Sequence, residues 1–192
     1  MGGIPDETLL DHVLGLASGK RLLYVPTAAM EDPARTVWWY ERLHGRAEMT
    51  HLHFFPWPPS RLRELVFDHD AILITGGNTA NALAVWRTHG FDQILREAWQ
   101  QGILLTGWSA GMICLGFLPG SACPHYDGEE RRRPVYKQLV AGGLASGVAA
   151  DDDVALHFTG TELCEVVTSR EGAAAYRVTP DGETELDARL LQ

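Results

Sequence analysis

The sequence predicts an α/β fold with a mainly parallel sheet flanked by helices, followed by antiparallel hairpins at the C-terminal end. Over the first two-thirds of the chain, short apolar runs alternate with segments of helical spacing, which is typical of a parallel sheet with helices on its faces. The last third instead holds short strand-like runs separated by glycine-containing turns, a pattern that predicts hairpins. Because no repeat or low-complexity linker interrupts this order, we expect residues 1–192 to form a single domain.

In the alternating part, apolar runs and, at Met49–Phe55, an alternation of polar and apolar residues predict the strands, and helical spacing predicts the helices. The expected strands are Arg21–Pro26, Met49–Phe55, Ala71–Thr75 and Ile103–Thr106. A proline in a first turn, a serine cap and a break at Gly90 delimit the helices. The expected helices are Leu9–Leu16, Pro33–His44, Ser60–Phe67, Asn78–His89, Phe91–Gln101 and the short segment Ala110–Leu115.

The last third begins with one helix and continues with strands. Turns containing Gly160, Gly172 and Gly182 separate the strands, and Asp-Gly between two strands is a strong hairpin signal. The expected elements are a helix at Pro134–Val140 and strands at Val154–Phe158, Leu163–Ser169, Ala174–Thr179 and Glu183–Leu190.

Composition and charge exclude several classes of protein. Apolar residues make up 45% of the chain and charged residues 21%, the ordinary balance of a globular protein. No apolar run approaches the roughly 18 residues of a membrane span, and no secretory signal is recognisable. The net charge of −9 argues against nucleic acid as a partner. Cys114, Cys123 and Cys164 form no C-x-x-C pair, so we expect a cytoplasmic protein with reduced thiols.

The strongest chemical signal is the pentapeptide Gly107-Trp108-Ser109-Ala110-Gly111, between an expected strand and a helix-capable segment. This context is typical of a nucleophile elbow, in which flanking glycines allow a tight turn and expose the serine. The N–H of Ala110 would then lie at a helix N-terminus, where it can bind an oxyanion. The alternative is a glycine-rich turn with a capping serine.

A second glycine turn, Thr75-Gly76-Gly77-Asn78-Thr79, also ends a strand and opens a helix. Ligands of open α/β sheets gather at the carboxyl ends of strands. The Gly76 and Gly77 amides are therefore candidates for a second oxyanion donor, and Asn78 or Thr79 for the helix cap. The alternative is a turn chosen for packing alone.

A serine nucleophile needs a neutral imidazole to accept its proton. His125, in Pro124-His125-Tyr126-Asp127, is the one histidine placed in a loop close after Ser109. His51 and His53 share a strand face, but no third ligand indicates a zinc site. The remaining histidines are interpreted as surface or hairpin residues: His12, His44, His69, His89 and His157.

Taken together and in this order, the Gly-Gly-Asn-Thr turn, the Gly-Trp-Ser-Ala-Gly elbow and the Pro-His-Tyr loop resemble the peptidase E family of serine peptidases, the aspartyl dipeptidases related to cyanophycinase. The resemblance covers nearly the whole chain and implies a fold like that of class I glutamine amidotransferases. It implies that Ser109 is the nucleophile and His125 the general base, and that Gly77 and Ala110 form the oxyanion hole.

The resemblance also implies a substrate, a short peptide with an N-terminal aspartate. Its carboxylate would be held by an arginine of the run Arg131 to Arg133; we favour Arg132, with Arg131 next. Without that role, the run is a solvated helix start. Asn78 and Thr79 are expected to contact the substrate. No metal or cofactor is implied, and a homo-oligomer is left open.

The acid of the triad is the unresolved part of this pattern. The family places it between the serine and the histidine, but Met112–Pro124 contains no Asp or Glu. Asp127 and Glu129 are the nearest substitutes, and Glu130 is weaker because it abuts the arginines. These carboxylates can equally face solvent and balance the arginines. The run Asp151–Asp153 is interpreted as a structural acidic turn.

Together with the resemblance, these observations predict hydrolysis of short peptides after an N-terminal aspartate, through an acyl-enzyme on Ser109. The alternative is a non-catalytic, amidotransferase-like module that binds a small acidic ligand or a partner protein. The stretch between Ser109 and His125, which lacks an acid, favours that alternative.

Overall fold

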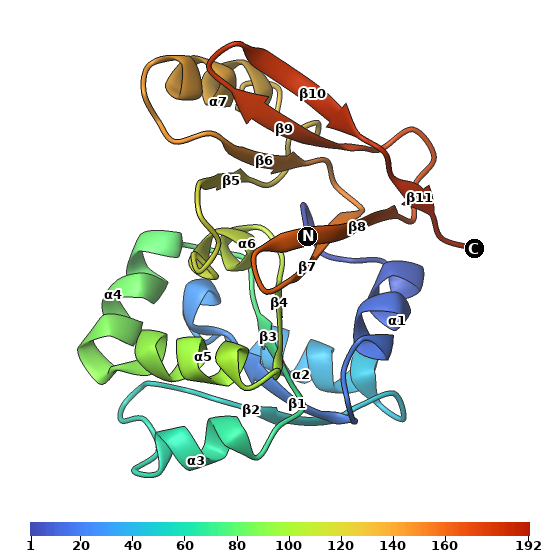
Figure 1. The fold of residues 1–192 in the computed structure, drawn as a ribbon. Helices are drawn as coiled ribbons and strands as arrows, with labels where there is room; N and C mark the ends of the chain where they lie inside the picture. Colours follow the sequence, from blue (N-terminus) through green and yellow to red (C-terminus); the bar gives the residue numbers. More distant parts are fainter. The chain divides into compact units, whose positions relative to one another are not determined.

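The computed structural model describes residues 1–192, and its chain divides into two units (Figure 1). Residues 13–114 form one of them, which we call the parallel-sheet unit. Residues 1–12 and 115–192 form the other, the strand-rich unit. The expectation of a single domain stays a prediction.

The parallel-sheet unit contains a four-stranded sheet in which every neighbouring pair is parallel, in the order β2-β1-β3-β4. The two central strands are buried almost throughout, which explains their continuous apolar runs. The predicted parallel sheet with flanking helices is thus confirmed. Its strands are β1 (Arg21–Val25), β2 (Glu48–His51), β3 (Ala71–Ile74) and β4 (Leu104–Gly107).

The helices of this unit follow the strands in sequence, and Figure 1 shows α4 and α5 side by side. Helix α3 also contacts α5. Gly90 breaks α4 from α5 in the left-handed conformation (φ 69°), which glycine adopts without steric cost. The first helix of the chain, α1, runs from one unit into the other. The helices are α1 (Glu7–Gly15), the 3₁₀ turn η1 (Thr27–Ala29), α2 (Pro33–Leu43), α3 (Leu62–Phe67), α4 (Thr79–His89), α5 (Phe91–Gln100) and α6 (Ala110–Cys114).

Buried aromatic side chains connect these helices to the sheet. Trp39 of α2 packs against Tyr24 of β1 and Trp108, with ring centroids 5.9 and 4.9 Å apart. Trp86 of α4 packs against Phe91 of α5, with centroids 5.4 Å apart. Large buried aromatic rings dominate core energetics. The residue before Ser109 is therefore anchored in the core.

The strand-rich unit contains a mixed four-stranded sheet, β10-β9-β6-β5, and a three-stranded sheet, β11-β8-β7. Most neighbours are antiparallel, as the hairpin turns predict, but β5/β6 and β11/β8 are parallel. Buried Tyr126, Tyr136 and Tyr176 lie in one hydrophobic cluster of this unit. The elements are β5 (Ser121–Cys123), α7 (Arg132–Ala141), β6 (Gly147–Ala150), β7 (Val154–Thr159), β8 (Glu162–Thr168), β9 (Ala175–Thr179), β10 (Gly182–Leu186) and β11 (Arg189–Leu190).

The structure differs from the expected elements in several places, among them the start of α3, where Arg61 and not Ser60 precedes the helix and no side chain caps it. The predicted strand Met49–Phe55 ends at His51, because the Phe54 and Phe55 N–H groups donate to the Glu31 carboxylate instead of to a strand. The predicted strand Glu183–Leu190 is split, and its last residues leave β9 to pair with β8. Strands β5 and β6 were not expected, since their short sequences of small residues carry no clear pattern.

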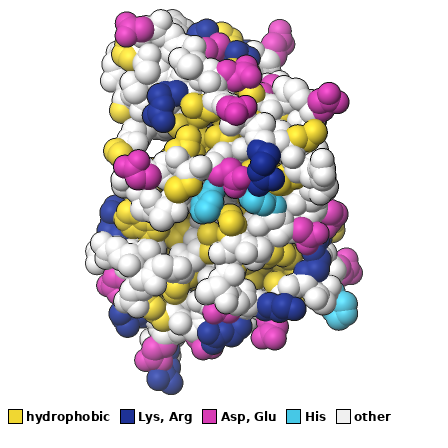
Figure 2. All heavy atoms as spheres, turned by 45° about the vertical axis from the view of Figure 1, so that its right-hand side comes forward, with side chains coloured by type: hydrophobic (Ala, Val, Ile, Leu, Met, Phe, Trp, Pro, Cys, Tyr) yellow, Lys and Arg dark blue, Asp and Glu magenta, His cyan; other side chains and the backbone are white.

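Acidic and basic side chains are interspersed on the face drawn in Figure 2, which shows no broad patch of one sign. This face therefore carries no basic stripe of the kind that marks a nucleic-acid interface. No helix combines the length and the apolar composition that a membrane span requires.

Candidate active site

Ser109 lies in a sharp turn between β4 and α6, with a left-handed backbone (φ 53°). Side chains rarely adopt this conformation, and it persists where the surroundings impose it. The turn is closely packed around Ser109: a Cβ at Gly107 would lie 2.8 Å from the Gly111 carbonyl carbon, and a Cβ at Gly111 would lie 2.4 Å from the Ile74 carbonyl oxygen. The turn therefore has the strained strand-to-helix geometry of a nucleophile elbow.

The turn after β3 lies directly against this elbow. A Cβ at Gly76 would be 3.0 Å from the Ser109 Cβ, and a Cβ at Gly77 would be 1.9 Å from the Ala28 carbonyl oxygen. The N–H groups of Gly77 and Ala110 have no hydrogen-bond acceptor within the protein. The next amide, that of Asn78, donates instead to Ala28. Two unpaired amides close to a serine can stabilise an oxyanion.

Asn78 and Thr79 begin helix α4. The Asn78 side-chain oxygen accepts a hydrogen bond from the Asn81 N–H at 2.9 Å, which makes Asn78 the cap. Burial raises the pKa of the Cys114 thiol to about 11, and the nearby Thr79 side chain lowers it only in part. The contact of Asn78 and Thr79 with a substrate stays a prediction.

His125 lies in the strand-rich unit and also has a left-handed backbone (φ 54°). Its Nδ1 is 2.7 Å from Oδ1 of Asp152. The Asp152 carboxylate fits closely against glycines, because a Cβ at Gly128 would lie 2.3 Å from Oδ2 and a Cβ at Gly3 2.6 Å from Oδ1. An imidazole whose Nδ1 donates to a carboxylate keeps its lone pair on Nε2, as a general base requires.

The carboxylate beside the His125 ring is not one of those expected from the sequence. The carboxylate on the His125 ring is Asp152, whereas Asp127 and Glu129 have other partners. Asp127 accepts the Asp152 N–H at 2.9 Å and pairs with Arg170, and Glu129 pairs with Arg132. Asp152 belongs to the run that the sequence indicates as a structural acidic turn, and 27 positions separate it from His125. The only sequence feature that marks Asp152 is its place in an acidic run just before a strand.

The three arginines that follow the histidine loop differ in their partners. Arg132 donates twice to Glu129, from Nε at 3.1 Å and from Nη2 at 2.6 Å, and the hydrogen bond lowers the pKa of Glu129. Arg133 donates twice to Glu183. Arg131 is exposed and has no ion pair. Arg132 already makes the forked contact that a substrate carboxylate would need.

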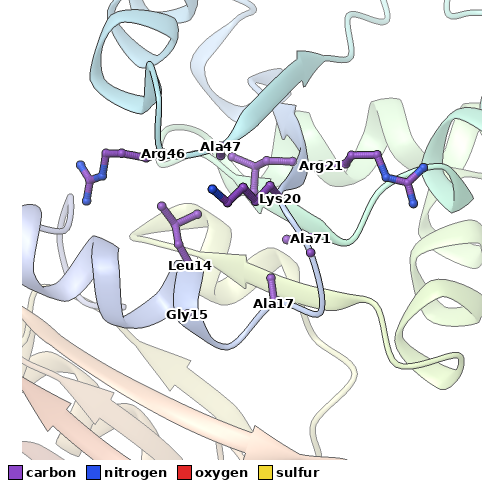
Figure 3. Close-up of a pocket in the computed structure, with 10 residues that line it drawn as sticks. Leu14, Gly15, Ala17, Lys20, Arg21, Arg46, Ala47 and Ala71 are labelled. Atoms are coloured by element: carbon purple, nitrogen blue, oxygen red, sulfur yellow. The ribbon is translucent and has the colours of Figure 1, made fainter.

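A cavity of about 220 Å³ lies elsewhere in the parallel-sheet unit (Figure 3). Lys20, Arg21 and Ala71, at the amino ends of β1 and β3, contribute to its wall. Ser109 and Gly77 follow the carboxyl ends of the same sheet, so this cavity is separate from the elbow. No three His, Cys, Asp or Glu side chains lie close enough to hold a metal ion.

Comparison with solved structures shows the fold. A peptidase from an acI-B1 Actinobacterium superposes with a TM-score of 0.70 at 21% identity, over 96% of this chain and 91% of that one. A putative peptidase E protein from Listeria monocytogenes EGD-e gives a TM-score of 0.58 at 19% identity, over 71% of this chain and 83% of that one. Both likenesses agree with the predicted peptidase E fold.

Comparison of sequences shows the family. The chain is 41% identical over 197 aligned residues to YgaJ of Bacillus subtilis (strain 168), which is named an uncharacterized peptidase; the alignment covers 91% of this chain and 86% of that protein. The family model of peptidase family S51 matches residues 5–116 and 112–166. The predicted resemblance to peptidase E is confirmed, and the chain belongs to peptidase family S51.

Proposed function

We propose that this peptidase is a serine peptidase that hydrolyses short peptides through an acyl-enzyme on Ser109. The elbow is the observation that carries the proposal. Ser109 has a left-handed backbone (φ 53°) in a turn whose glycines leave no room for a side chain. Strain maintained in this way is characteristic of functional sites, and a serine that served only as a helix cap would not need it.

In the proposed reaction, the Ser109 Oγ attacks the scissile carbonyl carbon while Nε2 of His125 accepts the hydroxyl proton. The Gly77 and Ala110 N–H groups bind the oxyanion that develops on the carbonyl oxygen. The C–N bond then breaks, and His125 passes the proton to the leaving amine. Water hydrolyses the resulting ester by the same route in reverse. Asp152 holds the imidazole in the required tautomer.

The proposed substrate carries an N-terminal aspartate. A guanidinium binds a carboxylate through two parallel hydrogen bonds, and Arg132 makes such a contact with Glu129. In our proposal the substrate carboxylate takes the place of Glu129, and Arg131 is the second candidate because it is exposed and unpaired.

Labelling with a fluorophosphonate tests the nucleophile, since only an activated serine reacts quickly. We expect rapid labelling of the wild-type protein at Ser109, and loss of both labelling and hydrolysis in Ser109→Ala and His125→Ala. Unfolding of the Ser109→Ala protein in urea should match that of the wild type. Slow labelling, unchanged by either substitution, would instead support the non-catalytic module.

Substrate preference is tested separately with short peptides that begin with Asp, Asn or Ala. We expect the Asp peptide to be cleaved with the highest kcat/KM. Rapid labelling of Ser109 together with equal rates on the three peptides would preserve the serine peptidase and remove the aspartate preference.

A further inference from the structure

The loop that carries Asp152 is tied to an arginine that follows the end of β8. Nη2 of Arg170 donates to Oδ2 of Asp127 at 2.5 Å and to the Asp152 carbonyl oxygen at 3.0 Å. Nε of the same side chain donates to Oδ2 of Asp153 at 3.1 Å. One guanidinium therefore joins three acidic residues that would otherwise repel one another.

Asp127 extends this connection to the backbone of Asp152. Its Oδ1 accepts the Asp152 N–H at 2.9 Å. Burial raises the pKa of Asp127, but the hydrogen bonds from the Asp152 N–H and from Arg170 outweigh it, so the pKa is lowered and the carboxylate stays ionised. Both the amide and the carbonyl of Asp152 are thus fixed by the Arg170–Asp127 pair.

The backbone on either side of the His125–Asp152 contact needs such support. His125 (φ 54°) and Asp153 (φ 64°) both have left-handed conformations that side chains rarely adopt. The Asp152 side chain is 36% exposed, so packing alone does not fix its carboxylate. Thr168, at the end of β8, adds a hydrogen bond from its hydroxyl to the Asp153 carbonyl oxygen at 3.1 Å.

We propose that Arg170, acting together with Asp127, is a positioning residue that keeps the Asp152 carboxylate on Nδ1 of His125. The inference rests on the proposed function, in which that contact orients the general base. It extends the site from the imidazole through two carboxylates to an arginine 45 positions further along the chain. Arg170 itself acts only through these residues.

A double-mutant cycle tests this role. We expect Arg170→Met to lower kcat on an Asp peptide by about 10- to 100-fold with little change in KM. In an Asp152→Asn background the same substitution should change kcat less than about threefold, because the contact that it supports is already lost. Asp127→Asn should behave in the same way, and Arg170→Lys should restore part of the activity.

Arg189→Met is the matched control. Arg189 also lies in the strand-rich unit and donates twice to Glu165, at 2.8 and 2.6 Å, in a forked ion pair that does not involve Asp152. Its loss should leave kcat within about twofold in both backgrounds, because an exposed pair contributes little. Thermal unfolding of every variant shows which are folded, and Asp127→Asn replaces Arg170→Met in the cycle if the latter does not fold.

The outcomes separate this inference from the proposed function. If Arg170→Met lowers kcat equally in both backgrounds, or does not lower it in the wild-type background, the positioning role is overturned. A low kcat of Asp152→Asn would in that case still support Asp152 as the orienting acid. Full activity of Asp152→Asn would overturn both the positioning role and Asp152 as the orienting acid. If Arg170→Met lowers kcat only when Asp152 is intact, the proposal is supported.

Discussion

The two units position their candidate catalytic residues by different means. In the parallel-sheet unit, Ser109 is placed by its neighbours in sequence and by glycine turns that press against it. In the strand-rich unit, His125 is placed by side-chain hydrogen bonds to Asp152 and through it to Asp127 and Arg170. The first arrangement depends on backbone shape and the second on charge. Removing a supporting side chain should therefore disturb the position of His125 far more than the position of Ser109.

Among residues that only orient another group, the largest expected effect is that of Asp152, the proposed acid in the strand-rich unit. Asp152→Asn should lower kcat/KM by about 10⁴-fold, because an amide at this position favours the wrong imidazole tautomer. Its free energy of unfolding should change little, since the side chain is partly exposed. The measurement is hydrolysis of an Asp peptide together with urea unfolding.

Glu129→Gln is the comparison for that substitution. Glu129 lies only four positions from His125 but pairs with Arg132. On an Ala peptide, the Glu129→Gln protein should keep kcat within about threefold of the wild type, because the loss of an exposed ion pair has little effect. A large loss in Glu129→Gln with full activity in Asp152→Asn would reverse the assignment of the acid.

In the parallel-sheet unit, a substitution that collides with the backbone should be the most disruptive change. In Gly111→Ala the added Cβ would lie 2.4 Å from the Ile74 carbonyl oxygen, so β3 or α6 must shift. We expect a loss of about 3 kcal/mol or more in the free energy of unfolding, measured by urea denaturation.

Gly15→Ala is the matched control, at the end of α1 with no atom within 4 Å of the added Cβ. It should change the free energy of unfolding by less than about 1 kcal/mol. Equal effects of the two substitutions would show that the elbow is not shaped by close packing of its glycines.

The same contrast explains what could be predicted from the sequence. The strands and helices around Ser109 were predicted closely, because apolar runs, proline and glycine act over a few residues. The elbow could be recognised for the same reason. In the strand-rich unit, β5 and β6 were missed, since strands of three and four small residues have no pattern of their own.

Asp152 was missed for a related reason. Its hydrogen bond with His125 spans 27 positions, and the Arg170–Asp127 pair spans 43. No periodicity encodes such contacts; they depend on how β7 and β8 pair and on where their ends lie. Nearness in sequence favoured Asp127 and Glu129, and the fold gives them different partners.

A smaller effect concerns specificity. Arg132→Met should lower kcat/KM for the Asp peptide by about 10- to 100-fold, the value of a charged hydrogen bond, and leave the Ala peptide within about threefold. Glu129→Gln should lower KM for the Asp peptide, because it removes the carboxylate that now occupies Arg132. Arg131→Met is the parallel variant, and an Asp preference that survives both arginine substitutions would place the substrate carboxylate elsewhere.

The smallest expected effect concerns a second charge network of the strand-rich unit, around Glu183. Burial raises the pKa of Glu183, but contacts with Arg133, Tyr126 and Lys137 outweigh it and lower the pKa to about 2, from 4.5. Because the folded state binds the proton less tightly, the stabilisation is fully present above pH 4.5 and disappears as the pH falls toward 2.

Glu183→Gln should therefore lower the free energy of unfolding by about 1–3 kcal/mol at pH 7. The difference from the wild type should shrink as the pH falls from 4.5 toward 2, which urea denaturation at several pH values would measure. Glu185→Gln, an exposed position on the same strand β10, controls for loss of net charge and should have little effect at any pH. A difference between Glu183→Gln and the wild type that stays constant across this range would mean that the contacts of Glu183 stabilise the fold by packing and not by charge.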